Sequence, residues 1–532
     1  MNVRCSFPSA GAVLLTALAL LGSVKADDLA PPPAPARERV LEERLKALEA
    51  RYDAMERRHT EEVDALAKKY ELLRRDVAIK PTEATPAAIG PSIALSARPT
   101  PEGGEGAEDN LAPSLRLPTK AKAGSKRTPL KASFGPAIEL RSEDDEFQLQ
   151  IRYLSQVDYR GYQQPNEDPV ASGFSFPRQR LYFSGRLTKP IEYYLTLNRG
   201  YGTLDVFDAF INYHYDDRLM FKVGRFKTPF SYEFYAMSAP DFVVPERSLF
   251  ASNFGPNRQL GAMAWGQVLD KRVDYAAGIF NGNRLSFQDN NNDKSFIAYM
   301  NARPFDSEDA PLSLKNLNFG GSVDVSNDAG TPLPNVLRTS IAASNAADAT
   351  NIAPPFLAFN KNVVESGYRS LYGAHVAYFY KHLSLMAEWD GGFATYATGS
   401  SNLSRVKVPI ESYYVSFGYF LTGETLERRG PIKPLRPFDL RPGKFGLGAW
   451  ELQGRFSSLN LGQQVFTGGL ADQNLWTNHL YTTDLGVSWY LNEYAKIYLD
   501  WEHAVFGNPV EYRPGGLQKT SDLFWLRFQV FF

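Results

Sequence analysis

The chain has 532 residues, of which 22% are charged and 13% aromatic, so it is long enough for several soluble domains or for one large barrel. Its formal net charge of −1 excludes a general electrostatic attraction to nucleic acid. Any preference for anions must therefore come from the placement of individual basic side chains.

The N-terminus has the pattern of a secretory signal peptide. The apolar run Ala12–Leu21 is too short to span a bilayer as a helix, Arg4 precedes it, and the small-x-small sequence VKA follows it. We therefore predict that residues 1–26 are a signal peptide that is cleaved after Ala26. The only cysteine, Cys5, lies in this segment, so we expect no disulfide and no thiolate metal site in the exported chain.

The next segment, residues 27–80, has the pattern of an α-helical coiled coil. From Arg37 to Lys80 it is rich in Glu, Arg, Lys, Ala and Leu and contains no Gly or Pro. A single charged, solvated helix is the alternative, although a narrow apolar seam on such a helix would stay wet. The apolar residues recur every three or four positions, with one stutter at His59: Leu41, Leu45, Leu48, Tyr52, Met55, Val63, Leu66, Tyr70, Leu73 and Val77.

Residues 81–135 lose this periodicity. They are rich in Pro, Ala, Gly, Thr and Lys, a composition typical of flexible linkers. We predict a linker that ends where a different pattern begins, at about residue 136.

Between residues 136 and 532, apolar and polar residues alternate, which indicates β-strands with one dry face and one wet face. In the last run, apolar residues from Phe524 to Phe532 alternate with Arg527 and Gln529. We predict an all-β fold, a transmembrane antiparallel β-barrel of about sixteen strands. The expected strands are 147–160, 178–188, 191–199, 205–215, 219–226, 259–269, 272–280, 294–303, 317–325, 370–380, 383–391, 411–421, 446–458, 479–490, 496–505 and 522–532.

The lengths of the connections distinguish this barrel from a soluble β-sandwich, whose strands also alternate. Most gaps after even-numbered strands are tight turns and most gaps after odd-numbered strands are long, which is the layout of an outer-membrane barrel. The gaps 304–316 and 422–445 are exceptions. Aromatic residues near the strand ends are expected to form girdles at the two membrane interfaces: Tyr213, Tyr215, Trp389, Tyr419, Trp489, Tyr490 and Trp501.

The C-terminal residue, Phe532, is aromatic. A C-terminal aromatic strand is typical of barrels that the outer-membrane assembly machinery inserts. We expect the last strand to pair with the first strand, near Phe147, and so to close the barrel.

A barrel of about sixteen strands leaves an aqueous lumen, whereas eight strands close around their own side chains. The third long loop, 227–258, contains four prolines, which disfavour regular sheet, and it is the candidate for narrowing the lumen. Guanidinium groups suit phosphate because their planar fork matches two oxyanion oxygens. The candidate residues of an anion path or constriction are Lys227, Arg258, Arg225, Arg247, Arg180, Arg186, Arg152 and Lys222.

Some of these side chains could instead form structural ion pairs. Glu246 precedes Arg247, and carboxylates lie near Arg258 in the sequence. A second basic cluster, in the turn 422–445, is either a solvated loop or a turn folded toward the pore mouth. Its members are Arg428, Arg429, Lys433, Arg436, Arg441 and Lys444.

Six motifs, spread in order over most of 138–532, together resemble the phosphate-selective porin O and P family. The resemblance implies a trimeric sixteen-stranded porin in which loops three and five and one periplasmic turn fold into the lumen. It also implies an anion path lined by arginines and lysines, and Lys227 and Arg258 lie within matching motifs. The motifs are VGRFKTPFSYE (223–233), ERSL (246–249), NRQLGAMAWG (257–266), GYFLTGE (418–424), GLGAWELQGRFS (446–457) and LGVSWYLN (485–492).

The sequence therefore predicts an outer-membrane porin for passive diffusion of small hydrophilic solutes, with a preference for anions such as phosphate or polyphosphate. The alternative is a general or sugar-permeable porin, in which Tyr182 and Tyr194 could stack on sugars. Such a porin could also tether the outer membrane to the cell wall through residues 37–80, which are expected in the periplasm.

The predicted partners are two further copies of the chain in a homotrimer, outer-membrane lipid, the barrel assembly machinery and the cell wall. No cofactor, metal or nucleic acid is predicted. An enzyme is not predicted either, because no histidine lies in a nucleophile or metal motif. The histidines are His59, His214, His375, His382, His479 and His503.

Overall fold

The computed structural model describes residue 46 and residues 128–163, 169–201, 204–285, 287–289, 291–341, 352–399 and 404–532. The chain divides into two units, Met1–Leu117 and Pro118–Phe532, and the fold below is that of the second unit. The predicted signal peptide, all but one residue of the predicted coiled coil, and the predicted linker up to residue 127 lie outside the described residues.

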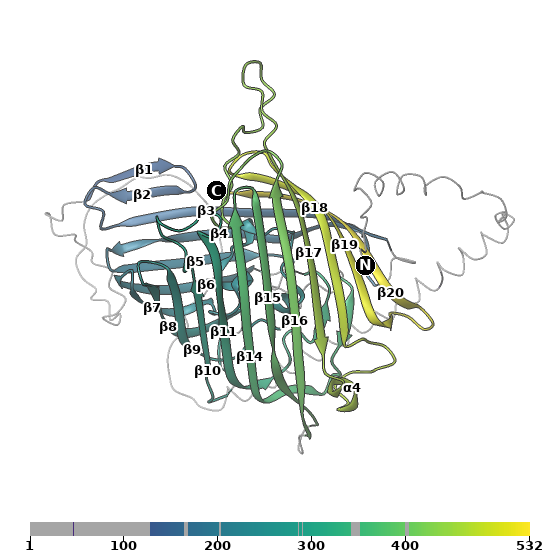
Figure 1. Ribbon diagram of the computed structural model, residues 1–532. Coiled ribbons are helices and arrows are strands. Elements are labelled where there is room, and N and C mark those ends of the chain that lie inside the picture. The colour runs from purple at the N-terminus through teal and green to yellow at the C-terminus, as the bar shows by residue number, and fades with distance from the viewer. Residues whose placement is uncertain are drawn as a thin grey trace, which may run out of the picture. The chain divides into compact units, whose positions relative to one another are not determined.

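Sixteen strands of the described part of the chain form one antiparallel sheet that closes into a barrel (Figure 1). Each strand pairs with its neighbours in chain order, and each of the sixteen predicted ranges overlaps one strand, so this prediction is confirmed. The strands are β3 (Gln148–Gln163), β4 (Gly173–Thr188), β5 (Ile191–Arg199), β6 (Leu204–Asp216), β7 (Leu219–Lys227), β8 (Arg258–Val268), β9 (Val273–Phe280), β10 (Ser295–Ala302), β11 (Asn316–Gly330), β14 (Val363–Tyr380), β15 (Leu383–Thr398), β16 (Ser404–Phe420), β17 (Ala449–Leu461), β18 (His479–Tyr490), β19 (Ala495–Glu511) and β20 (Leu517–Phe531).

The last strand closes the barrel against the first, as the sequence predicts. Phe531 lies opposite Leu154, and the backbones of Phe532 and Tyr153 exchange two hydrogen bonds of 2.8 and 3.1 Å. The partner of Phe532 is therefore Tyr153 and not Phe147. Closure gives each of these sixteen strands a hydrogen-bonded neighbour on both sides. Hydrocarbon requires this because it offers the backbone no hydrogen-bonding partner.

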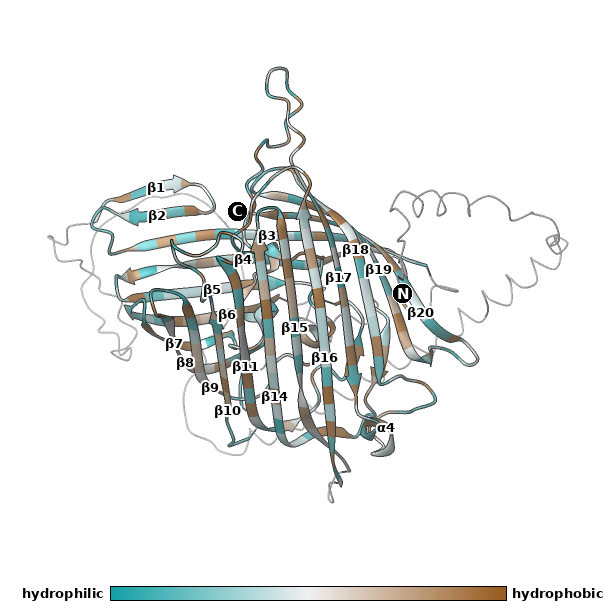
Figure 2. Ribbon diagram, in the orientation of Figure 1, coloured by the Kyte–Doolittle hydropathy of each residue, from teal (hydrophilic) through white to brown (hydrophobic). Residues whose placement is uncertain are grey.

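Hydrophobic and hydrophilic residues alternate along the strands of the wall (Figure 2). On β6 and β7, Ile211, Tyr213 and Val223 point outward and are 58%, 47% and 61% exposed, whereas Asn212 points inward and is buried. This is the pattern expected of a wall with lipid outside and polar groups inside. The expectation that Tyr490 belongs to an outer girdle is wrong, because it faces the lumen and donates a hydrogen bond of 2.7 Å to Glu451.

Several strands extend beyond their predicted ranges on the side of the long loops. β14 begins at Val363 where 370 was expected, and β16 begins at Ser404 where 411 was expected. About ten residues suffice to cross the bilayer. In the added part of β16 the apolar residues Val408 and Ile410 face inward and Lys407 is exposed. The apolar face is therefore the reverse of that in the membrane band, where Tyr413 and Val415 are exposed, although the backbone pairing continues.

A short hairpin precedes the barrel. It consists of β1 (Leu130–Phe134) and β2 (Ile138–Ser142), and β2 pairs with β3 through Ile138 and Ile151. The linker predicted for 81–135 therefore ends too late, since its last residues form β1. All five residues of β1 are exposed, so burial imposes no apolar alternation on that sequence.

Two long loops fold into the barrel, as the family resemblance implies. Loop 3 (residues 228–257) contains three short helical turns, η3 (Tyr232–Ala236), η4 (Ala239–Asp241) and α3 (Leu249–Asn253). Loop 5 (residues 331–362) contains the strand pair β12 (Val336–Arg338) and β13 (Pro355–Ala358). Phe230 and Phe250 of loop 3 share one buried apolar cluster with Leu337 and Phe356 of loop 5. A short helix, α4 (Gln464–Thr467), follows β17.

The long turn between β16 and β17, turn 6 (residues 421–448), only partly matches the expectation of an inward fold. Leu426 and Arg429 are buried inside the barrel. Beyond them the turn extends away from the rim (Figure 1), with Leu435 68% and Phe445 67% exposed. Its basic cluster is thus divided, because Arg429 enters the lumen while Lys433, Arg436, Arg441 and Lys444 stay exposed.

No helix within the described ranges is long and apolar enough to cross a bilayer.

Candidate functional site

Loop 3 is held to one side of the barrel by a buried carboxylate between two guanidinium groups. Glu246 pairs with Arg178 of β4 at 2.5 Å and with Arg527 of β20 at 2.8 Å. Burial by itself raises the pKa of the Glu246 carboxyl, but the two guanidinium groups outweigh burial and hold that pKa well below its usual value. The charged form of Glu246 is therefore the stable one in the folded protein.

A second carboxylate, Glu388 of β15, anchors the start of loop 3. It accepts hydrogen bonds from the backbone N–H of Tyr232 at 2.6 Å and of Glu233 at 3.2 Å, and from the Ser231 hydroxyl at 3.0 Å. Ser231 has a φ of +67°, which is uncommon for a residue with a side chain. The three hydrogen bonds to Glu388 stabilise this backbone conformation.

The middle of loop 3 is bound to the same part of the wall. The carbonyl oxygen of Phe242 accepts hydrogen bonds of 3.0 Å from Lys496 and from Tyr498 of β19, and Gln529 of β20 donates one of 3.1 Å to Pro240. These contacts place the loop against the strands from β15 to β20 and the adjacent β3 and β4. The open space lies on the loop's other side, along β4 to β8.

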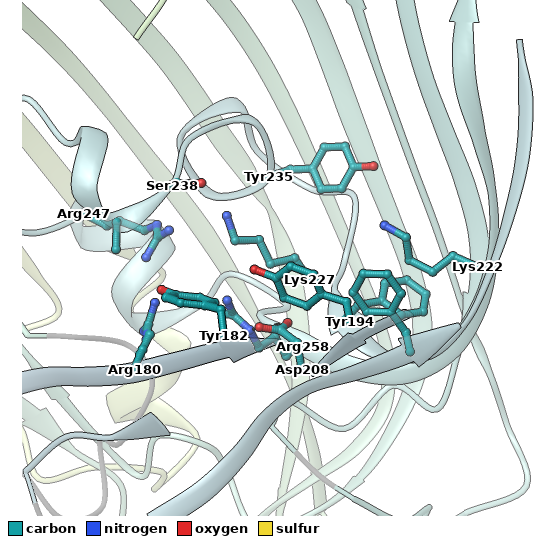
Figure 3. A pocket seen from close by; sticks show the side chains of 13 residues that line it. Arg180, Tyr182, Tyr194, Asp208, Lys222, Lys227, Tyr235, Ser238, Arg247 and Arg258 are labelled. Carbon is teal, nitrogen blue, oxygen red and sulfur yellow. Dashed lines mark hydrogen bonds and ion pairs between the residues drawn. The ribbon is translucent and has the colours of Figure 1, made fainter. Parts of the chain in front are cut away.

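That space contains a cavity of about 290 Å³ between loop 3 and the wall (Figure 3). Side chains from five neighbouring strands and from loop 3 line it. They are Arg180, Tyr182, Tyr194, Asp208, Phe210, Lys222, Phe226, Lys227, Tyr235, Ser238, Ala239, Arg247 and Arg258.

The lining has five basic side chains and one carboxylate. The carboxylate, Asp208, pairs with Arg258 at 2.9 Å. Among the described residues the other four basic side chains have no carboxylate oxygen within 4.0 Å. Lys227 donates instead to the Met237 carbonyl at 2.8 Å, and Arg180 donates to the Asn198 amide oxygen at 2.9 Å. The cavity therefore carries an excess of positive charge.

Arg247 shows this excess most clearly. Its guanidinium lies over the rings of Phe242 and Phe234, at 4.4 and 4.8 Å from their centroids. Burial lowers the pKa of Arg247, and the charges of Arg178 and Arg258 lower it further, although a guanidinium group keeps its proton in proteins. The hypothesis that Glu246 holds Arg247 in an ion pair is wrong, because Glu246 is occupied by Arg178 and Arg527.

Five of the eight residues predicted from the sequence meet in this cavity: Arg180, Lys222, Lys227, Arg247 and Arg258. Arg258 does have a structural carboxylate, but it is Asp208, fifty positions away, and not a neighbour in the sequence.

The other three predicted residues lie outside the cavity. Arg225 donates instead to the backbone carbonyls of Val206 and Phe207. Arg186 pairs with Asp145 at 2.8 Å, and Arg152 donates to Gln150 at 3.2 Å.

Six lining residues were missed: Asp208, Phe210, Phe226, Tyr235, Ser238 and Ala239. Asp208 lies two and four residues before the inward-facing Phe210 and Asn212. Because every second residue of a strand lies on the same face, the alternation of β6 could have identified it. Tyr235 and Ser238 lie in loop 3, where no periodicity exists, and only the folded path of the loop reveals them.

A larger cavity of about 900 Å³ adjoins the first and shares Tyr235 with it. Its lining includes residues of the short turns, so it forms a vestibule at that end of the barrel. Five carboxylates and five cations balance there, which means that the charge excess is confined to the smaller cavity. The carboxylates are Glu192, Asp217, Asp274, Asp306 and Glu427, and the cations are Lys271, Arg303, Lys315, Arg428 and Arg429.

Comparison with known proteins identifies the family. The family model described as phosphate-selective porin O and P matches residues 147–504. The chain belongs to this family. It is an outer-membrane porin. No curated protein matches the sequence significantly.

The chain is also similar to several solved structures, at low sequence identity. OmpT of Vibrio cholerae is 8% identical and aligns over 73% of this chain and 98% of its own, with a TM-score of 0.42. The outer membrane channel DcaP of Acinetobacter baumannii is 8% identical and aligns over 76% of this chain and 100% of its own, with a TM-score of 0.43. OprB of Pseudomonas putida is 11% identical and aligns over 73% of this chain and 95% of its own, with a TM-score of 0.43.

Replacing Glu246 with Gln should loosen loop 3. The substitution leaves the buried guanidinium of Arg178 without a carboxylate, while Arg527 keeps its pair with Asp158. Breaking a buried ion pair in this way costs about 3–5 kcal/mol. Thermal unfolding in detergent should begin at a lower temperature, and single-channel currents should become noisier. Asp216→Asn, which breaks an ion pair on an exposed turn, should leave both readings unchanged. An unchanged unfolding temperature for Glu246→Gln would show that this anchor does not hold the loop.

Replacing Asp208 with Asn should make the channel more selective for anions. The change removes the only carboxylate of the cavity lining and releases Arg258 from its ion pair. Reversal potentials across a planar bilayer in a KCl gradient measure the effect. Asp306→Asn makes the same charge change in the vestibule and should shift the potential less. Equal shifts for the two variants would contradict the claim that the smaller cavity, and not the vestibule, determines the ion selectivity.

Proposed function

We propose that this porin prefers anions and passes phosphate or polyphosphate through the cavity between loop 3 and strands β4 to β8. The observation that carries the proposal is the charge of the lining, with five cations and a single carboxylate. Four of those cations lack an ion pair within the described part of the chain, so they remain available to a passing anion.

Physical chemistry supports this reading of the cavity. A narrow site between low-dielectric walls focuses the field of its charges and raises the local concentration of counter-ions. Arg180, Arg247 and Arg258 can offer paired N–H donors to phosphate oxygens, while Lys222 and Lys227 act as point charges. Several weak sites in series allow an anion both to enter and to leave, as conduction requires.

The assembly of the porin forms part of the same proposal. We infer a homotrimer in the outer membrane, with the coiled coil of residues 27–80 in the periplasm and in contact with the cell wall. The family resemblance supports the trimer, and the exposed apolar side chains of the barrel wall support contact with lipid. The pairing of Phe532 with Tyr153 at the closing seam supports recognition of the last strand by the barrel assembly machinery.

A general or sugar-permeable porin is the second candidate. Tyr182 and Tyr194, the residues expected to stack on sugars, do line the cavity. A neutral sugar would use these rings without using the basic side chains, so ion selectivity separates the two candidates.

Reversal potentials test the anion preference directly. The wild-type channel should be selective for chloride over potassium, and phosphate should block the chloride current. The double variant Lys227→Gln with Arg247→Gln should lower the permeability ratio about fivefold or more, because a charge about 8 Å from an ion contributes about 1 kcal/mol at an effective dielectric constant of about 40.

The matched control is Arg441→Gln, which removes a cation from the exposed part of turn 6. It should leave selectivity unchanged. A wild-type channel without anion preference would overturn the proposed function.

A further inference from the structure

The cavity has a second property that inorganic phosphate does not use, a continuous row of aromatic rings along one wall. Tyr182 of β4 and Tyr194 of β5 have centroids 6.3 Å apart, Tyr194 and Phe210 of β6 are 5.2 Å apart, and Phe210 and Phe226 of β7 are 5.7 Å apart. Phe531 continues the row from Tyr182 at 6.3 Å. All but Phe531 line the cavity, and Tyr182, Tyr194 and Phe210 are only half-buried.

The rings present their edges to the space. Tyr194 and Phe210 are nearly parallel, at 13°, and lie directly opposite each other on adjacent strands, so their faces meet and their edges point into the lumen. Figure 3 shows the hydroxyl groups of Tyr182 and Tyr194 on the side of Arg247 and Lys227. Ring edges carry partial positive charge and pack favourably against the face of another ring.

The basic side chains stand within reach of this row. The Lys222 ammonium lies 4.6 Å from the Phe210 centroid. Arg247 enters the same cavity from loop 3, and Lys227 of β7 donates to the Met237 carbonyl of that loop. A solute that touches both features must therefore carry an anionic group and a flat apolar group in one small molecule.

The size of the space agrees with such a solute. A cavity of about 290 Å³ approaches the range of about 300–1,000 Å³ in which proteins hold small organic ligands. An inorganic anion has no apolar surface to place against the four rings.

We propose that the channel's preferred solutes are phosphate monoesters of aromatic groups, with the phosphate on the basic side chains and the ring against the row Tyr182–Tyr194–Phe210–Phe226. The inference rests on the proposed anion preference and names the solute class for the same cavity. The aromatic row then acts as a specificity element that inorganic phosphate does not engage.

Block of the chloride current in planar bilayers by three probes tests the inference on the full-length channel. The probes are inorganic phosphate, butyl phosphate and phenyl phosphate. Phenyl phosphate should bind about three- to tenfold more tightly than butyl phosphate, the range expected of one or two aromatic contacts. Equal affinities of these two esters in the wild-type channel would overturn the inference.

Variants separate the ring contacts from the charges. Phe210→Leu and Tyr194→Leu, each made alone, should bring phenyl phosphate to the affinity of butyl phosphate and leave block by inorganic phosphate unchanged. Phe456→Leu removes a ring that packs between Tyr413 and Tyr481 on the outer face of the barrel, and it should change none of the three affinities. Retention of the phenyl preference in both lumen variants would also overturn the inference.

The outcomes distinguish the inference from the proposed function. If no probe blocks and the channel shows no anion preference, the proposed function itself fails. If all three probes block with equal affinity, the anion preference stands and only the aromatic specificity is wrong.

Discussion

Hydrocarbon offers no partner for a backbone N–H or C=O group, so a sheet that crosses the membrane must close on itself. Here the pairing of β20 with β3 completes that closure after sixteen strands. A wall of this length encloses more space than its own inward side chains fill. Loops 3 and 5 therefore fill part of the space inside the wall. The polar contacts that hold loop 3, and the cavity that remains beside it, both result from this arrangement.

Loop 3 divides the lumen into two electrically different sides. Toward β15–β20, Glu246 pairs with Arg178 and Arg527, and Arg455 pairs with Asp484. This pairing offsets the cost of burying these charges. Toward β4–β8, Arg247 and Lys227 have no carboxylate partner within the described residues, and their charge is directed into water. On the proposed anion path, these unpaired cations are available to a passing anion.

The alternation of the strands made much of this predictable. It revealed all sixteen strands, the pairing of the last strand with the first, and the inward positions of Arg180 and Lys222. Alternate residues of a strand lie on opposite faces, so the pattern of polar residues indicates which face is in contact with water. It could not reveal the ends of β14 and β16, because beyond the membrane band the apolar residues of β16 change from the outward to the inward face. Loop 3 has no periodic pattern of apolar residues. The sequence therefore could not show that Glu246 pairs with Arg178 and Arg527 and not with Arg247. It also could not show that Tyr235 and Ser238 line the cavity.

The central claim is that ions cross the barrel through the positively charged cavity beside loop 3. Ser238 lines that cavity from the loop and is exposed, so Ser238→Cys places a thiol on the passage. The sharpest measurement compares its modification by a sulfonate-bearing and by a trimethylammonium-bearing methanethiosulfonate while current is recorded. The negative reagent should react about tenfold faster or more, because the cavity concentrates anions, and it should reduce the current. Equal rates for the two reagents, or full modification without any change in current, would contradict the account.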